Sequence, residues 1–190
     1  MRLTEPRTYR WSREEFHQMS DLGWFDEKRV ELIDGEIIEM PVAKPPHVTA
    51  LSLAEEALRA TFGTGFWIRT QAPLNLGPES EPEPDLSVVP GGPRDYPQHP
   101  TTALLVVEVS DTTLYLDRTR KAPLYARSGL ADYWIVNLVD RQLEVHRNPV
   151  ADSSAPSGFR YADVTILGPG DFVSPLAAPT ARVAVADLLP

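Results

Sequence analysis

The segment "ALLVVEVS", residues 103–110, decides the fold, because it is an apolar run of strand length that carries a single carboxylate, Glu108. A run that is apolar on both faces is typical of a central strand covered on both sides. Alternate residues of a strand share a face, so Leu104, Val106 and Glu108 point to the same side. An unpaired buried charge is costly, and the sequence therefore predicts that a partner holds Glu108 in place.

Turn and capping residues predict the elements around this strand. Ser12 and Glu15 form a capping box at the start of a short helix, and Asp34-Gly35 suits the turn of a β-hairpin. Apolar residues at helical spacing predict a long helix over 46–62. Further strands are expected at 66–72, 85–90, 132–137, 142–147, 159–167 and 171–178, with a helical stretch ending at 129, a loop at 150–158 and a short closing segment at 185–190.

This order of elements predicts the fold class. A hairpin, a helix, strands, a second helix and more strands indicate an α/β fold, in the form of a mixed α+β sheet with helices against it. The chain has 190 residues and a hydrophobic content of 42%, which suits one globular core. We therefore expect a single domain over residues 1–190.

Composition narrows the classes of ligand and compartment. The chain has no cysteine, and its four histidines are scattered along the sequence, so a zinc site is not expected and any metal would be held by oxygen. The first residues lack the apolar segment of a secretory signal, and no run approaches the roughly 20 apolar residues of a membrane span. The expectation is a cytoplasmic protein without a membrane partner.

The net charge argues against a surface that binds nucleic acid without regard to its sequence. The formal net charge is −9, whereas such surfaces are rich in lysine and arginine. Basic residues do gather in "DRTRKAPLYAR", residues 117–127. This cluster is either a local positive patch or, more commonly, the solvated face of a helix.

Two carboxylates are candidates for a metal site. Asp85 opens the expected strand 85–90, and sequential strands usually pair, so Asp85 and Glu108 are expected to meet. Their like charges would repel unless a cation lay between them, and Mg²⁺ or Mn²⁺ prefers such oxygen ligands. Two alternatives remain open. Asp85 could end an acidic linker, and Glu108 could form a buried ion pair with Arg118, Arg120 or Lys121.

Lys121 is the basic residue that we single out. Arginine outnumbers lysine fifteen to three in this chain, so a lysine is the unusual choice. A compact ammonium can point at a metal-bound water in a way that a guanidinium cannot, although a surface lysine is the commoner explanation. His47 is a weak candidate at the start of the long helix, and Tyr125 is most simply a packing residue.

Four blocks in order carry a resemblance to a known family. They are "RVELIDGEII", "EPDLSVV", "LVVEVS" and "DRTRKAPLYARSGLADYWIV", within a stretch from "YRWSREEF" to "VADLLP". The chain resembles the Uma-type restriction endonuclease family, within the PD-(D/E)xK nuclease superfamily. The resemblance implies a restriction-endonuclease-like core and a Mg²⁺-dependent or Mn²⁺-dependent site. It implies that Asp85, Glu108 and the carbonyl of Val109 bind the metal, that Lys121 orients or activates the attacking water, and that Glu31 is an accessory carboxylate.

Two positions depart from the plain superfamily pattern. Ser110 stands where the superfamily has lysine, two residues after the glutamate, and the family resembled places the lysine on the following helix, where Lys121 matches. Pro123 lies in that helix, and proline in a helix interior costs about 3 kcal/mol. The helix is therefore expected either to kink or to start near Pro123, which leaves the position of Lys121 open.

The expected function follows from the resemblance and has one alternative. The resemblance implies a metal-dependent endonuclease that cleaves phosphodiester bonds of nucleic acid, with DNA the favoured substrate and a 5′-phosphate product. A homodimer is expected by general frequency and analogy. The alternative is a catalytically inactive protein that keeps the nuclease fold and acts as a binding module, which the negative charge and Pro123 favour.

Overall fold

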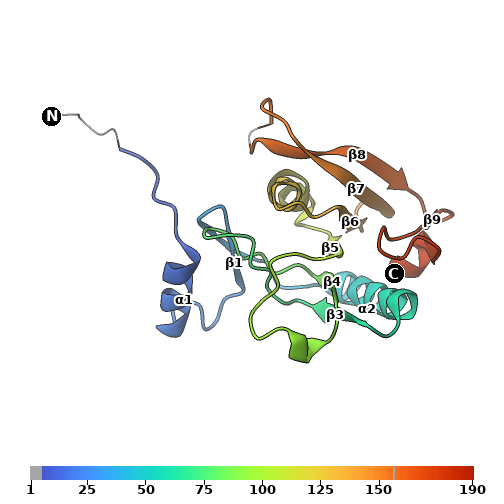
Figure 1. Ribbon diagram of the computed structural model, residues 1–190, viewed down its shortest axis with the longest axis horizontal. Coiled ribbons are helices and arrows are strands. Elements are labelled where there is room, and N and C mark those ends of the chain that lie inside the picture. The colour runs from blue at the N-terminus through green and yellow to red at the C-terminus, as the bar shows by residue number, and fades with distance from the viewer. Residues whose placement is uncertain (1–5, 156) are drawn as a thin grey trace.

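A six-stranded mixed sheet forms the centre of the structure, a computed structural model that describes residues 6–155 and 157–190 (Figure 1). The strands follow the order β3-β4-β5-β6-β7-β8 across the sheet. β5 and β6 are parallel, and the other neighbouring pairs are antiparallel. The six strands are β3 (Phe66–Thr70), β4 (Leu86–Pro90), β5 (Leu105–Ser110), β6 (Asp132–Asn137), β7 (Gln142–Ala151) and β8 (Phe159–Leu167).

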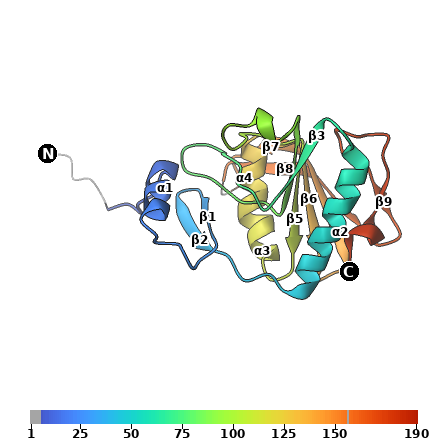
Figure 2. The ribbon, with the colours of Figure 1, turned by 90° about the horizontal axis from the view of Figure 1, so that it is seen from below.

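Helices cover both faces of this sheet, and Figure 2 shows α2 and α4 on opposite sides of it. The helices are α1 (Arg13–Asp21), α2 (Pro45–Phe62), α3 (Leu114–Leu116), the π-helical turn η2 (Asp117–Lys121), α4 (Ala122–Arg127) and the 3-10 turns η1 (Pro93–Asp95) and η3 (Val185–Leu188). Two small sheets complete the fold, β1 (Val30–Ile33) with β2 (Glu36–Glu39) and β9 (Phe172–Val173) with β10 (Val183–Ala184). None of the helices in the described ranges is long and apolar enough to cross a membrane. The α+β arrangement predicted from the sequence is confirmed.

β5 is buried along its whole length, as the apolar run predicts. Leu105, Val107 and Val109 pack in the cluster beneath α2, whereas Val106 packs in the cluster beneath α4. Each such side chain contributes about 1.5–3 kcal/mol when fully buried. The strand that decides the fold therefore contributes to two hydrophobic cores, one on each face of the sheet. Glu108 lies on the same face as Val106, the face covered by α4.

The hairpin β1–β2 lies at one end of the molecule beside α1 (Figure 2). Asp34 and Gly35 take positive φ angles of 52° and 71°, which confirms the predicted two-residue turn. The predicted capping box of Ser12 and Glu15 begins α1. The backbone of Leu32 accepts a hydrogen bond from the N–H of Glu81, at 2.7 Å. This bond ties the hairpin to the segment before β4 and so brings β1 next to the ends of β4 and β5.

The helical stretch after β5 resolves the question raised by Pro123. The N–H of Ala122 donates to the carbonyl of Asp117, five residues back, so the turn Asp117–Lys121 is wider than an α-helical turn. The α-helix α4 then starts at Ala122, next to Pro123, but the helical backbone runs on from the turn into α4 without a break. The structure thus accommodates the proline by a π-helical turn directly before it, within one continuous helical stretch. Lys121 points inward and is 1% exposed.

Two local expectations are wrong. Residues 150 and 151 were expected in a loop but belong to β7, because that strand pairs with β8 as far as Ala151 opposite Phe159. Residues 171–178 were expected to be extended, and only Phe172–Val173 form a strand, paired with β10. Cross-strand pairing decided both cases, and sequence composition does not show it. Position 156 of the expected loop lies outside the described residues.

The environment of Glu144 on β7 makes the free energy of unfolding depend on pH. Burial on its own raises the pKa of Glu144, but the ring of His146 and hydrogen bonds from Arg118 and Asn137 bring it down to about 2. The pKa is thus lower in the folded than in the unfolded chain, so ionised Glu144 stabilises the fold above pH ~4.5 and loses this effect as the pH falls through about 2.

We therefore expect Glu144→Gln to lower the free energy of unfolding by about 2 kcal/mol at pH 7, with a difference from the wild type that shrinks steadily below pH ~4.5. Urea denaturation across this pH range measures it. Glu55→Gln is the control, because Glu55 pairs with Arg59 on the outer surface of α2 and should matter by less than about 0.5 kcal/mol. A constant difference at every pH would contradict the assignment.

Candidate active site

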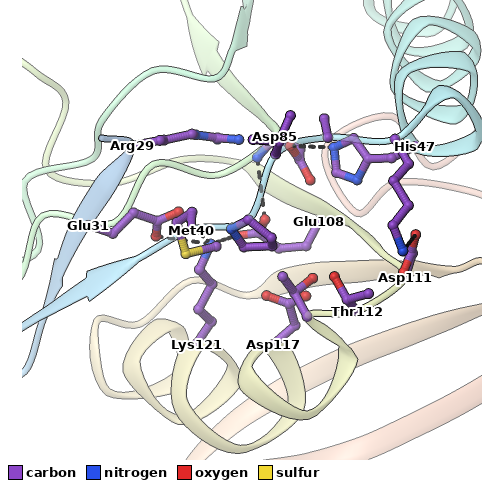
Figure 3. Close-up of a pocket in the computed structure, with 15 residues that line it drawn as sticks. Arg29, Glu31, Met40, His47, Asp85, Glu108, Asp111, Thr112, Asp117 and Lys121 are labelled. Carbon is purple, nitrogen blue, oxygen red and sulfur yellow. Dashed lines mark hydrogen bonds and ion pairs between the residues drawn. The ribbon is translucent and has the colours of Figure 1, made fainter. Parts of the chain in front are cut away.

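A small polar pocket opens where the ends of β4 and β5 meet the hairpin and the turn η2 (Figure 3). Its volume is about 40 Å³. Glu31, Asp85, Glu108 and Lys121, the side chains singled out from the sequence, all line it. They come from four separate segments of the chain, and Figure 3 shows their polar ends directed toward one another.

Strand pairing brings the two candidate metal ligands together. Leu86 lies opposite Val107 in the antiparallel pair β4–β5, so Asp85, one residue before the ladder, lies beside Glu108. The N–H of Asp85 is 3.4 Å from Oε2 of Glu108, and the N–H of Val109 donates to Oδ2 of Asp85 at 2.9 Å. Because the N–H and C=O of a strand residue face the same neighbour, the carbonyl of Val109 is also directed toward the Asp85 side. Val109 itself does not line the pocket.

Lys121 is the central cation of the pocket. Its Nζ lies 2.9 Å from Oε1 of Glu108 and 3.0 Å from Oε2 of Glu31, and all three side chains are almost fully buried. Burial lowers the pKa of Lys121, but the negative charges of Glu108, Glu31 and Asp117 outweigh it and raise the pKa above its usual range. The ammonium therefore keeps its proton at neutral pH and acts as a donor and a charge.

Arg118 and Arg120, the arginines next to Lys121, do not line this pocket. Arg118 donates to Glu144 at 2.6 Å, and Arg120 donates to Glu36 at 2.9 Å. Of the three basic partners considered for Glu108, only Lys121 forms an ion pair with it among the described residues. The contact between Lys121 and Glu108 is therefore expected both for a structural ion pair and for an active site. The basic cluster of residues 117–127 is largely matched by carboxylates rather than left as a positive patch.

Tyr125 contributes more than the packing expected from the sequence. Its ring lies 4.9 Å from that of Tyr133 in the core beneath the sheet, and its hydroxyl also donates to Oε1 of Glu108 at 2.8 Å. Burial and the charge of Glu108 raise the pKa of Tyr125, so the phenol stays protonated. Burial also raises the pKa of Glu108, and nearby Asp117 adds to the rise, while Lys121 opposes it.

Asp117 is a pocket residue that the sequence analysis did not single out. It is 1% exposed, its Oδ2 accepts a 2.7 Å bond from the hydroxyl of Ser110, and its Oδ1 has no partner among the described residues. Burial raises the pKa of this carboxyl. Ser110, two residues after Glu108, thus fixes one oxygen of Asp117. The only sequence feature that could have predicted a role for Asp117 is weak: it is a carboxylate four residues before Lys121.

His47 also lies in the pocket, although the sequence left it as a weak candidate. Its Nε2 is 3.2 Å from Oδ1 of Asp85, and it sits in the first turn of α2. The hydrogen bond with Asp85 raises the pKa of His47 against the effect of burial. Burial raises the pKa of Asp85, but the bonds from His47 and from the N–H of Val109 outweigh this and lower it. His47 therefore fixes Asp85 in its ionised form.

The donor set of this pocket fits a hard divalent cation. Its carboxylates outnumber its lysines and arginine, Lys121 is its only buried ammonium among the described residues, and Oδ1 of Asp117 is a buried acceptor without a described partner. Across residues 6–155 and 157–190, no group of three or more acidic or histidine side chains is arranged around one metal position. Mg²⁺ usually takes only one or two carboxylates and keeps waters or substrate phosphates as its other ligands. Asp85 and Glu108 are therefore the carboxylates that would hold it.

Comparisons with known proteins agree with this fold. The model of the Uma2 family, described as "Putative restriction endonuclease", matches residues 13–186. A crystal structure of "a putative nuclease belonging to DUF820" from Anabaena variabilis ATCC 29413 is similar, with 16% identity and a TM-score of 0.67, over 92% of this chain and 95% of that chain. This likeness confirms the expected restriction-endonuclease-like fold. No curated protein matches the chain.

Proposed function

Because the chain belongs to the Uma2 restriction endonuclease family, we propose that it is a metal-dependent endonuclease that hydrolyses phosphodiester bonds of nucleic acid, with DNA as its substrate. Membership of the family supports a nuclease, and the metal and the DNA are the finer parts of the proposal. One observation carries it. Asp85, Glu108 and Glu31 line a single pocket with a fully buried Lys121, and such clusters of buried ionisable groups are typical of functional sites.

Asp85 and Glu108 would hold the divalent ion, with the carbonyl of Val109 as a further ligand. When bound, such an ion stabilises negative charge on a phosphate and makes a water molecule more acidic. It would also reverse the negative charge of the pocket, which otherwise repels a phosphodiester.

The chain's own residues supply position and charge. Lys121 keeps its proton and would donate hydrogen bonds that orient the attacking water and offset charge developing on the phosphate. Tyr125 fixes one oxygen of Glu108, which leaves the other toward Asp85. His47 holds one oxygen of Asp85, and the N–H of Val109 holds the other. Glu31 shares the ammonium of Lys121 with Glu108 and so limits how strongly either carboxylate binds it.

Calorimetry with Mn²⁺ tests the metal site without a guess about substrate. The wild type is expected to bind one ion, and Asp85→Asn to weaken that binding by more than about tenfold, because the amide loses the anionic ligand. Asp163→Asn is the control, since Asp163 is an exposed carboxylate on β8. Equal binding by the wild type and Asp85→Asn would place the ion elsewhere and contradict the proposed ligands.

A catalytically inactive binding module is the second candidate, and the completed contact between Lys121 and Glu108 favours it. In that case Glu108 is a structural ion pair. Wild-type protein would then cleave no DNA or RNA, even where it binds Mn²⁺, and replacing Glu108 by leucine together with Lys121→Met would raise the free energy of unfolding, because well-packed apolar residues often replace a buried ion pair with a gain. Cleavage of DNA by the wild type that is lost in Glu108→Gln would reject this candidate.

A further inference from the structure

A second and larger cavity lies between α1 and the sheet. Its volume is about 890 Å³, and its lining shares no residue with the candidate active site. One wall comes from α1, and the other comes from β3 and the segment 96–100. The side chains that matter on this second wall are Trp67, Arg69, Tyr96 and His99.

Arg69 is a buried cation in this wall. It is 3% exposed, and no carboxylate among the described residues lies within ion-pair distance of it. Nη1 donates to the carbonyl of Pro73 at 2.9 Å and Nη2 donates to Nδ1 of His99 at 3.3 Å, while Nε has no partner. A guanidinium has five N–H donors, so most of its donors are left without a bond. Burial lowers the pKa of Arg69, but arginine stays charged in proteins.

The acidic groups of the cavity do not neutralise Arg69. Glu81 accepts from His17 at 2.8 Å and lies 3.6 Å from Nε of Arg13, so its charge is matched on its own side. Glu14 and Asp21 belong to the wall formed by α1. The cavity therefore has one wall of mixed charge, from α1, and an opposite wall whose buried cation lacks a counter-charge among the described residues. A buried, unpaired charge is unfavourable, and a bound anion would remove that cost.

Aromatic rings adjoin this cation. The rings of Trp67 and Tyr96 are 5.8 Å apart, and the guanidinium of Arg69 lies 5.0 Å from the centre of the Trp67 ring. Both aromatic side chains are only partly buried and line the cavity. Aromatic faces next to arginine are the groups that stack a nucleobase and pair its phosphate.

We propose that this cavity binds a nucleoside phosphate, either free or as one unit of a nucleic-acid strand, with the phosphate at Arg69 and the base against Trp67 and Tyr96. The volume falls within the range of about 300–1,000 Å³ that is usual for small-ligand sites. The site is separate from the candidate active site and would exist whether or not the protein cleaves nucleic acid.

The test is calorimetric titration with deoxyadenosine monophosphate and with a short single-stranded oligodeoxynucleotide, both in EDTA so that no metal takes part. The wild type is expected to bind at least one of them at a single site, and Arg69→Gln to weaken that binding by about tenfold or more. Arg94→Gln is the matched control, because Arg94 is an exposed arginine of η1 outside the cavity lining. Binding of the mononucleotide identifies a free nucleotide, and binding of the strand alone identifies nucleic acid.

A second variant keeps the test informative if Arg69→Gln does not fold. Trp67→Leu should weaken binding of the mononucleotide and leave the weaker binding of inorganic phosphate unchanged, because it removes only the stacking surface. Glu108→Gln should bind like the wild type, which separates this site from the proposed catalysis. Absence of saturable binding by the wild type would overturn the proposal. So would mononucleotide binding by Arg69→Gln and by Trp67→Leu that is as tight as that of the wild type.

Discussion

Replacing Glu108 by glutamine is expected to reduce cleavage of DNA by about a thousandfold or more and to abolish Mn²⁺ binding, while the protein stays folded. Glutamine has the same shape and an amide oxygen that can accept from Lys121 and Tyr125, so the buried contacts of the side chain are largely kept. What disappears is the negative charge that would hold the ion. Loss of activity should therefore come with little change in the free energy of unfolding.

Cleavage assays with supercoiled and linear DNA in Mg²⁺ and Mn²⁺ measure this effect beside thermal denaturation of the same samples. Glu83→Gln is a matched control, because Glu83 pairs with Arg29 and does not line the pocket. Its activity is expected to stay within about twofold of the wild type. Cleavage by Glu108→Gln at the wild-type rate, in a preparation free of other nucleases, would contradict the mechanism.

The second large effect is expected at Lys121. Lys121→Met keeps the length of the side chain and removes its ammonium, which leaves Glu31 and Glu108 buried without their cation. Removing one partner of a buried pair typically costs about 3–5 kcal/mol, so the free energy of unfolding should fall by that amount near pH 8. Activity should be lost as well, since no other described amino group lies in the buried part of the pocket.

The dependence of this cost on pH identifies its cause. Without the ammonium, the buried carboxyls have a pKa above that of the unfolded chain, so the folded state binds more protons and the deficit shrinks as the pH falls through that raised pKa. Adding Glu31→Gln to Lys121→Met should recover part of the lost stability, whereas independent sites would add. Lys28→Met is the control, because Lys28 pairs with Glu39 at the surface. A Lys121→Met protein as stable as the wild type would show that the ammonium is not the counter-charge.

Much of the fold could be predicted from short-range patterns. The apolar run of β5, the Asp34-Gly35 turn and the capping box of Ser12 each follow from the preferences of a few adjacent residues, and the structure has all three. The expected pairing of β4 with β5 also placed Asp85 beside Glu108, because adjacent strands usually pair. The ends of β7 and β9 were predicted less well, since cross-strand partners determine where a strand stops.

The candidate site could be predicted only in part, because most of its contacts join distant segments. Glu31 reaches Lys121 through a hairpin that backbone hydrogen bonds hold against the segment before β4, such as those from Glu81 to Leu32 and from Gly35 to Glu79, and no local pattern encodes that contact. His47 approaches Asp85 because the first turn of α2 lies beside the pocket (Figure 3). Contacts between residues this far apart in the sequence produce no periodic pattern from which they could be predicted.

The wide turn η2 before α4 sets the direction in which Lys121, its last residue, points. Successive residues of an α-helix are about 100° apart around its axis, so one residue more or fewer in that turn swings every later side chain by that angle. Five residues, Asp117–Lys121, form the turn here, and the ammonium lands between Glu31 and Glu108. A relative that lacked one of them could keep the same charged residues in the same order and still point its lysine away from the carboxylates. Whether the lysine reaches the two carboxylates thus depends on the number of residues in the turn as much as on which residues they are.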